Sequence, residues 1–365
     1  MDIQELSKMP LLTGFNRVER FYPGGKLLDE WQGLPVQSDG HMTEEFLVST
    51  IEYIGTGNPP EKGVSCVLLP NNEKKNLYKL INEDIEAFLG HRYAKHCRGH
   101  AGVQVRAGDS ISRLIIQAHP NNDQARNFYN SPFGKTEAWF INGTREIQGE
   151  KPHVYCGFKP GITREKWREL FKAQDIRGIL DSLHRFDVKR GDCFLVKAGT
   201  PHAIGSGCFY IELHQPCDIT LRVERKRDFY PQPFTDEQMH FGPGFDVLFD
   251  CFDYTGRDRE QTMAQVFMNP AVESVSEGGT IYSMIGYDKN QDFSMKKIVL
   301  RGSVSLPRFD GHYLIVTAKG TATLEYNGGI LTVPQGRGVF VPASCGELKA
   351  AGNAELILAY PFLVD

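Results

Sequence analysis

Hydrophobic and polar positions follow two patterns along the chain. Between residues 72 and 90, apolar side chains recur at helical spacing and the run ends at Gly90, which predicts one amphipathic helix. A second helical stretch is predicted near 163–185, where Thr163 has the place of an N-terminal cap before the run REKWRELF. In most of the remaining chain, short apolar stretches with alternating polar positions are separated by glycine turns, which indicates short strands.

The strand pattern predicts a mainly β protein. Residues 12–54 mix aromatic residues, glycines and alternating positions, and turn pairs such as Gly-Asp, Gly-Thr and Gly-Gly recur along the rest of the chain. The outline of GDCFLVKAGTPHAI (191–204) returns as GGILTVPQGRGVFVPASC (328–345). This repeat favours two related β-domains, and the short strands predict that each is a β-barrel of the jelly-roll kind or a double sheet.

Chain length and a mixed segment place the boundary between these domains. A chain of 365 residues with 41% hydrophobic residues is long for one core and can form two. The stretch from Phe234 to Phe267 has mixed polarity and an uneven period, which is typical of a connecting helical segment, so we place the boundary near residue 270. We therefore expect a first domain over residues 1–270, which contains the small helical insertion, and a second domain over 271–365.

Charge and composition narrow the classes of partner. The formal net charge of −4 gives no net-basic signature, so we expect no nucleic-acid partner. No window approaches the ~20 uninterrupted apolar residues of a spanning helix, and the N-terminal residues lack the pattern of a signal peptide. We therefore expect a cytoplasmic protein that does not contact a membrane. We also expect a monomer, although the sequence itself does not show the oligomeric state. Eight scattered cysteines without a CxxC pair favour free, mostly buried thiols.

Four residues in separate segments look like one metal site on this β-scaffold. Gln117 and His119 lie two apart in IIQAHPNN, and they project together because alternate side chains leave the same face of a strand. Glu137 in GKTEAW and His202 in AGTPHAIGSG add a carboxylate and a second imidazole. This donor set suits a borderline divalent ion such as zinc, with room for water or substrate, so the site would be catalytic. The repeated outline has no histidine or carboxylate at its second corner, so we expect one zinc ion per chain.

The segments QAHPNN, KTEAW, AGTPHAIGSG and IELHQPCDITLRV occur in an order and at a spacing that resemble class I mannose-6-phosphate isomerase, a family of zinc enzymes in the cupin superfamily. The resemblance is strongest over residues 114–223 and continues more weakly through the C-terminal part. It implies two cupin-like domains. It also implies a zinc-dependent isomerase that interconverts mannose 6-phosphate and fructose 6-phosphate through a cis-enediol.

The resemblance also implies roles for individual residues. It makes Gln117, His119, Glu137 and His202 the zinc ligands, Arg222 the leading catalytic residue, Lys135 a neighbour of the substrate, Glu212 a residue of the pocket wall and Arg106 a candidate contact for the substrate phosphate. Moving a proton between C2 and C1 needs a base with a tuned pKa and a stabiliser for charge that develops on oxygen. A permanently cationic arginine suits the second task. Glu212, Lys135 and a metal-bound hydroxide all remain candidates for the base.

Two departures from the family pattern leave the substrate open. The family typically reads L-S-[IV]-Q, with the serine near the substrate phosphate, where this chain has Ile115, and the family's T-Y-R has Leu221 in place of the tyrosine. Both changes leave the metal ligands intact. The alternatives are therefore an isomerase of another aldose or aldose phosphate, and a non-catalytic cupin that binds metal and senses sugar. No P-loop or dinucleotide fingerprint is found in the sequence, so we expect no nucleotide cofactor.

Overall fold

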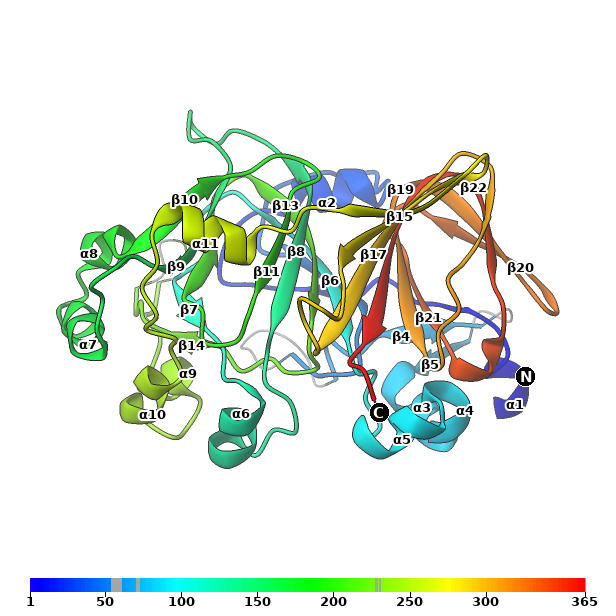
Figure 1. Ribbon diagram of the computed structural model, residues 1–365, viewed down its shortest axis with the longest axis horizontal. Helices are drawn as coiled ribbons and strands as arrows, with labels where there is room; N and C mark the ends of the chain where they lie inside the picture. Colours follow the sequence, from blue (N-terminus) through cyan, green and yellow to red (C-terminus); the bar gives the residue numbers. More distant parts are fainter. Residues whose placement is uncertain (54–60, 70–72, 227–228, 230, 365) are drawn as a thin grey trace.

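The structure of the protein is a computed structural model, and it describes residues 1–53, 61–69, 73–226, 229 and 231–364 (Figure 1). In this part of the chain, three antiparallel β-sheets stand side by side along the long axis of the molecule, and short helices lie at their ends and edges. The protein is therefore mainly β, as the sequence predicts.

The first layer is a five-stranded sheet that carries three of the predicted site residues. Its strand order is β10 (Leu183–Asp187), β9 (His153–Phe158), β12 (His202–Ile204), β7 (Gln117–Ala118) and β14 (Leu221–Arg222). The register pairs Gln117 with His202 on one side and with Arg222 on the other. Directly opposed residues of antiparallel strands share a face, so these three side chains leave the same face of the sheet.

The second layer is a six-stranded sheet in the middle of the molecule, and the third is a nine-stranded sheet built mainly from the C-terminal part. The order of the second is β11 (Cys193–Val196), β8 (Glu137–Thr144), β13 (Cys208–His214), β6 (Gln104–Ser110), β3 (Glu44–Val48) and β2 (Arg17–Val18). The third runs β1 (Leu11–Leu12), β21 (Gly338–Val341), β19 (Tyr313–Tyr326), β22 (Lys349–Pro361), β17 (Phe293–Leu300), β16 (Gly279–Ile285) and β15 (Ala271–Ser276), with β18 (Ser303–Ser305) on β22 and β20 (Gly329–Pro334) on β19. A separate ribbon pairs β4 (Cys66–Leu68) with β5 (Lys74–Asn76).

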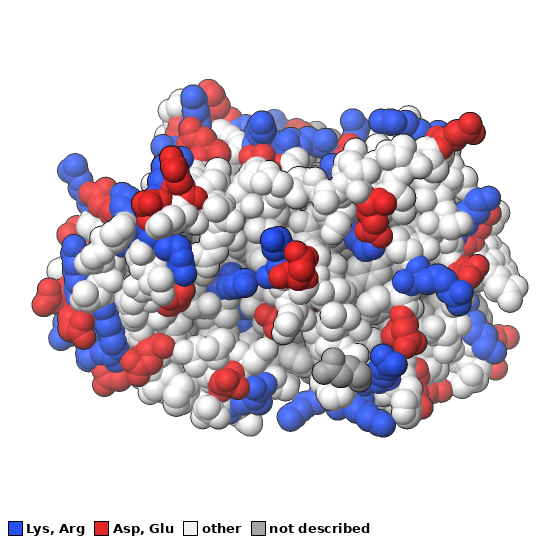
Figure 2. Space-filling view, in the orientation of Figure 1, with Lys and Arg blue, Asp and Glu red and all other residues white. Residues whose placement is uncertain are grey.

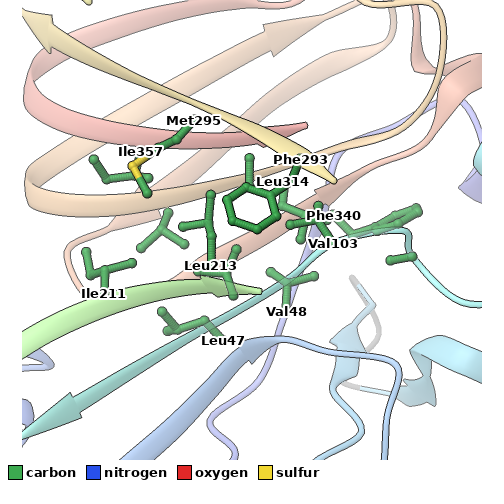
Figure 3. Close-up of a cluster of buried hydrophobic side chains, with 14 of the residues drawn as sticks. Leu47, Val48, Val103, Ile211, Leu213, Phe293, Met295, Leu314, Phe340 and Ile357 are labelled. Atoms are coloured by element: carbon green, nitrogen blue, oxygen red, sulfur yellow. The ribbon is translucent and has the colours of Figure 1, made fainter. Parts of the chain in front are cut away.

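Successive side chains of the central strands point to opposite faces of the second layer, and both of these faces are buried. Ile211 and Leu213 of β13 point toward the third layer and join its apolar core. Figure 3 shows them near Phe293, Met295, Leu314 and Ile357. Tyr210 lies on the opposite face in another apolar cluster, and Glu212 follows it on that face at the wall of a cavity. The C-terminal sheet thus covers one face of the second layer and leaves the other face for the candidate site.

The helices are short. In the described residues they are α1 (Ile3–Leu6), α2 (Lys26–Trp31), α3 (Leu77–Glu83), α4 (Ile85–Leu89), α5 (His91–His96), α6 (Asn122–Tyr129), α7 (Arg164–Ala173), α8 (Ile176–Asp181), α9 (Asp236–His240), α10 (Phe245–Asp250) and α11 (Arg259–Val266), with a 3-10 turn at Ala343–Cys345. The connecting segment before residue 270 is helical, as predicted. The proposed domain boundary falls between α11 and β15, while β1 pairs with β21 and so places the N-terminal residues in the third layer.

Two helix predictions need correction. The single helix predicted over residues 72–90, of which residue 72 lies outside the described residues, consists of β5 followed by α3 and α4. Asp84 interrupts the helix with φ −153° and ψ 81°, and its side chain accepts a hydrogen bond from the backbone N–H of Ala87 as the cap of α4. In the second stretch Thr163 caps α7 as predicted, but the chain from Leu183 onward is a strand. The helix α2 was not predicted, because its six residues follow two turn glycines within a strand-like pattern.

The closed β-barrels predicted from the sequence are not found. Among the described residues, none of the sheets joins its first strand to its last by hydrogen bonds. The strands β7, β12 and β14 are only two or three residues long, and side chains of the candidate site fill the space between the first and second layers. Alternation of apolar residues shows which positions are buried, and it is the same for a barrel and for a pair of facing sheets.

The state of the cysteines and the distribution of charge on the surface agree with the composition of the chain. All eight cysteines are free thiols, and seven of them are buried. Figure 2 shows acidic and basic side chains interspersed over one face of the molecule. Within the described residues, we find no helix with the length and apolar character that a membrane span requires.

Gly108 of β6 leaves space for a ring of the candidate site. A Cβ at this position would lie 2.4 Å from the Tyr210 ring, so Gly108→Ala is expected to displace that ring and to lower the free energy of unfolding by about 1–3 kcal/mol. Denaturant titration measures the effect. Gly40→Ala is the control, because an added Cβ there meets nothing within 4 Å. Equal stability of the two variants would contradict the prediction.

Candidate metal centre

Three of the four predicted metal ligands lie together between the first and second layers. His119 follows β7, His202 begins β12, and Glu137 begins β8 on the facing sheet. Nε2 of His119 lies 3.3 Å from Oε2 of Glu137, and Nε2 of His202 lies 3.1 Å from Oε1 of the same carboxylate. One ligand atom from each residue lies within 4.8 Å of the other two, and all three side chains are buried. The spacing suits a single ion held between them.

Hydrogen bonds orient both imidazoles toward this point. Nδ1 of His119 lies 2.8 Å from the carbonyl oxygen of Ile219, and Nδ1 of His202 lies 2.8 Å from that of Thr200. A carbonyl only accepts, so each Nδ1 carries the proton and each Nε2 presents its lone pair. Burial, with Lys135 nearby, lowers the pKa of His119 to about 3. His119 is therefore neutral at neutral pH, as a metal ligand must be.

Glu137 is fixed as a carboxylate. Its Oε2 accepts a hydrogen bond from Nζ of Lys135 at 2.6 Å, and its Oε1 accepts one from the indole N–H of Trp139 at 3.1 Å. Burial alone would raise the pKa of the Glu137 carboxyl, but the Lys135 ammonium holds that pKa well below its usual range. Two neutral imidazoles and one carboxylate form the donor set of a zinc-type site.

Gln117 and Arg222 extend the same row of the first layer. Nε2 of Gln117 lies 3.4 Å from Nε2 of His202, and a half-turn of the amide exchanges its nitrogen for its oxygen. The amide therefore can supply the fourth ligand atom. The Arg222 guanidinium is buried over the rings of Phe234 and Phe241. Its Nη1 donates to the backbone carbonyl oxygens of Thr220 and of Gln238 in α9, so Arg222 lies in the same row of the sheet as Gln117 and His202 and also contacts that helix.

Lys135 and Glu212 connect the metal residues to a second charged group. Nζ of Lys135 lies 3.1 Å from Oε1 of Glu212, and Glu212 receives Nε and Nη2 of Arg106 at 3.0 and 2.8 Å. Burial raises the pKa of the Glu212 carboxyl. Burial alone would lower the pKa of Lys135, but Glu137 and Glu212 raise it. Lys135 is therefore an ammonium ion held between two carboxylates.

Residues that the sequence did not single out continue this network. Arg106 also approaches Oε2 of Glu44 at 3.4 Å and Oδ1 of Asp218 at 3.5 Å. The Tyr22 hydroxyl donates to Oε1 of Glu44 at 2.6 Å, and Nε of Arg20 lies 3.1 Å from the same oxygen. One feature of the sequence could have indicated them, namely the charged residues inside strand-like stretches such as FNRVERFY and TEEFLV. A charged residue that is buried in a strand needs a charged or hydrogen-bonding partner.

Two cavities lie beside these residues. The inner cavity, of about 10 Å³, lies between Arg20, Glu44, Gln117, Glu137, His202 and Glu212 and has the room of one water molecule. The outer cavity, of about 210 Å³, lies between Phe21, Ser112, Arg113, Ile115, Glu224 and Lys226. Phe21 lines both.

Facing antiparallel sheets with a buried His-Glu-His cluster between them define a β protein of cupin type with a candidate metal site. A family model described as mannose-6-phosphate isomerase, cupin domain, matches residues 284–361. The mannose-6-phosphate isomerase of Streptococcus mutans serotype c is 33% identical over 360 residues, which cover 96% of this chain and 98% of that relative. The chain therefore belongs to the mannose-6-phosphate isomerase family, and it is an enzyme of the intramolecular oxidoreductase class.

Further comparisons agree with this family. The mannose-6-phosphate isomerase ManA of Bacillus subtilis (strain 168) is 26% identical over 272 residues, which cover 69% of this chain and 72% of ManA. A crystal structure of the mannose 6-phosphate isomerase from Bacillus subtilis superposes with a TM-score of 0.75 at 21% identity, over 96% of this chain and 99% of that one. The fold is thus shared along nearly the whole chain, including the third layer.

Proposed function

We propose that the chain interconverts mannose 6-phosphate and fructose 6-phosphate through a cis-enediol and that zinc is its metal. The observation that carries the proposal is the buried cluster of His119, Glu137 and His202, joined through Lys135 to Glu212 at one cavity. The 33% identical relative carries the name of this isomerase. We propose Gln117 as the fourth ligand. Zinc would supply Lewis-acid polarisation of the substrate oxygens.

Glu212 is the base that the geometry favours. It lines the inner cavity together with Glu137 and His202, so a sugar carbon placed there lies within its reach. Burial raises its pKa toward the operating pH, which suits a group that must both take and return a proton. Lys135 does not line this cavity and contacts Glu137 and Glu212 instead. We therefore assign Lys135 to positioning both carboxylates.

The two cavities suggest how a sugar phosphate is placed. The inner cavity is too small for a whole hexose, so the reacting carbons face it while the other carbons and the phosphate extend into the outer cavity. Ser112 and Lys226 line the outer cavity and are suitable donors for phosphate oxygens. Arg106, to which the family resemblance gives this contact, is already enclosed by three carboxylates. We propose that Arg106 orients Glu212, and that Arg222 stabilises negative charge on the enediol.

A coupled assay tests this function. Zinc-loaded protein is expected to form fructose 6-phosphate from mannose 6-phosphate, chelator treatment is expected to abolish turnover, and added zinc is expected to restore it. The physical reason is that polarisation of the substrate oxygens is lost with the ion. Turnover that survives complete removal of metal would contradict metal dependence.

A second candidate rests on Ile115. This apolar residue lines the outer cavity where the family pattern has a serine, so another aldose or aldose phosphate is the alternative substrate. A panel of free and phosphorylated aldoses, assayed with the same zinc-loaded protein, separates the two. Faster turnover of an aldose other than mannose 6-phosphate would replace the preferred substrate, and silence with every sugar would favour a non-catalytic, sugar-sensing role.

A further inference from the structure

Arg20 differs from Arg106, the second arginine that lines the inner cavity. Its side chain is 8% exposed and lines this cavity together with Glu137 and His202. Among the described residues, its Nε and Nη1 have no hydrogen-bond partner. The Nε atom lies 3.1 Å from Oε1 of Glu44 as an ion pair without hydrogen-bond geometry. Two buried nitrogen donors without acceptors are destabilising, so a partner from outside the chain is expected.

Arg106 cannot take the same role, because its guanidinium is already enclosed. It makes a two-bond contact with Glu212 and approaches Glu44 and Asp218 with a third nitrogen. A substrate oxygen would have to displace one of these carboxylates. At Arg20 no such displacement is needed, since the ion pair with Glu44 leaves donors available.

Arg17 lies three residues before Arg20, and the hydrogen bonds of its side chain can be compared with those of Arg20. Its Nε bonds Glu45, its Nη1 bonds a backbone carbonyl, and its Nη2 contacts Gln32 and Asp29. Every nitrogen of this side chain has an acceptor. The neighbouring carboxylates Glu44 and Glu45 lie on opposite faces of β3, so the Arg20–Glu44 pair lies at the cavity and the Arg17–Glu45 pair does not. The unmet donors thus belong to the cavity rather than to the segment.

The surroundings of Arg20 hold it in place for a ligand. The guanidinium stacks over the Tyr53 ring, 4.4 Å from the ring centroid. Glu44 is itself fixed by the Tyr22 hydroxyl. A planar fork held on two sides is preorganised, which lowers the entropy lost when it binds.

We propose that Arg20 is a substrate-binding residue whose unpaired N–H groups donate to hydroxyl oxygens of the sugar in the inner cavity. The inference rests on the proposed function for the identity of the sugar. The Arg20 contact would bind hydroxyl groups of the sugar, and it is distinct from the proposed metal ligands and from the phosphate donors of the outer cavity. Because the contact is made equally before and during proton transfer, its loss affects KM more than kcat.

The test compares Arg20→Met with Arg17→Met in the full-length, zinc-loaded protein. Arg20→Met is expected to raise KM for mannose 6-phosphate by about 10- to 100-fold, with kcat and metal content close to wild type. Tm is expected to fall in both methionine variants, because each loses a buried ion pair. Arg20→Lys keeps the positive charge but loses the planar guanidinium, so its KM is expected to lie between those of wild type and Arg20→Met. Arg17→Met is expected to keep the wild-type KM. Inorganic phosphate, used as a competitive inhibitor, is expected to have the same inhibition constant with wild type and Arg20→Met.

Three outcomes would overturn the inference. An unchanged KM in Arg20→Met excludes the contact. A phosphate inhibition constant that rises in parallel with KM moves Arg20 to the phosphate. A raised KM in Arg17→Met as well identifies a general effect of the segment.

A binding experiment decides on Arg20 if the wild type fails to isomerise mannose 6-phosphate. In that case the proposed function fails by itself, and wild type and Arg20→Met are titrated calorimetrically with the same sugar phosphate. Weaker binding in the variant supports the contact, and equal or undetectable binding by both proteins overturns it.

Discussion

Zinc is expected to be lost from His119→Ala, and isomerase activity is expected to fall to background with it. The imidazole supplies one of two nitrogen donors to the site, and its Nε2 is held toward Glu137 by the bond from Nδ1 to the Ile219 carbonyl. Removal of a residue that merely orients a ligand typically costs 10- to 100-fold in metal affinity, so loss of the ligand itself is expected to cost more than about 100-fold. Elemental analysis after dialysis measures metal content, and the coupled assay measures turnover.

A matched control separates ligation from damage to the sheet. His184 lies on β10 of the same five-stranded layer, is 6% exposed, and bonds a backbone carbonyl through Nε2. His184→Ala therefore removes a comparable buried imidazole from a strand that contributes no residue to the wall of the inner cavity, and it is expected to keep metal and activity. Circular dichroism checks that both variants retain their β-structure. Full metal content in His119→Ala would refute its assignment as a ligand.

The proposed metal ligands are recognisable in the sequence because each lies in a short motif whose order and spacing resemble those of the family. Gln117 and His119 are two apart, and Glu137 and His202 each have a distinctive local motif. The structure brings His119, Glu137 and His202 together. What the sequence does not contain is the pairing of strands, since β7, β12 and β14 are too short to be read from alternation.

The charged wall of the inner cavity is a different case. Glu44 and Glu45 are adjacent and chemically identical, and both are buried, yet Glu44 faces the cavity and Glu45 pairs with Arg17. Only the register of β3 against its neighbours decides which one faces inward. The break between α3 and α4 at Asp84 is also not visible in the sequence pattern. The apolar spacing continues through Asp84, whereas the helix is interrupted by the backbone conformation and the capping hydrogen bond of that one residue.

Glu212→Gln is expected to lower kcat by about 100- to 10,000-fold, the range that a positioned acid–base group contributes, while metal content stays unchanged. An amide is nearly isosteric with the carboxylate, so the side chain keeps its volume, and its single oxygen keeps one of the two hydrogen bonds from Arg106. It cannot take a proton from the sugar carbon. Lys135 keeps its second partner, Glu137, so the metal residues keep their positions.

Exchange of the substrate proton with solvent gives this prediction a second readout. In deuterated water a base at Glu212 takes the C2 proton of mannose 6-phosphate before it is delivered to C1, so Glu212→Gln is expected to slow exchange and isomerisation by a similar factor. Glu45→Gln is the control, because Glu45 is an equally buried carboxylate bonded to an arginine away from the cavity. Wild-type kcat in Glu212→Gln would exclude this carboxylate as the base. Loss of activity in both variants would instead point to a general effect of disturbing a buried ion pair, since each carboxylate is buried and bonded to an arginine.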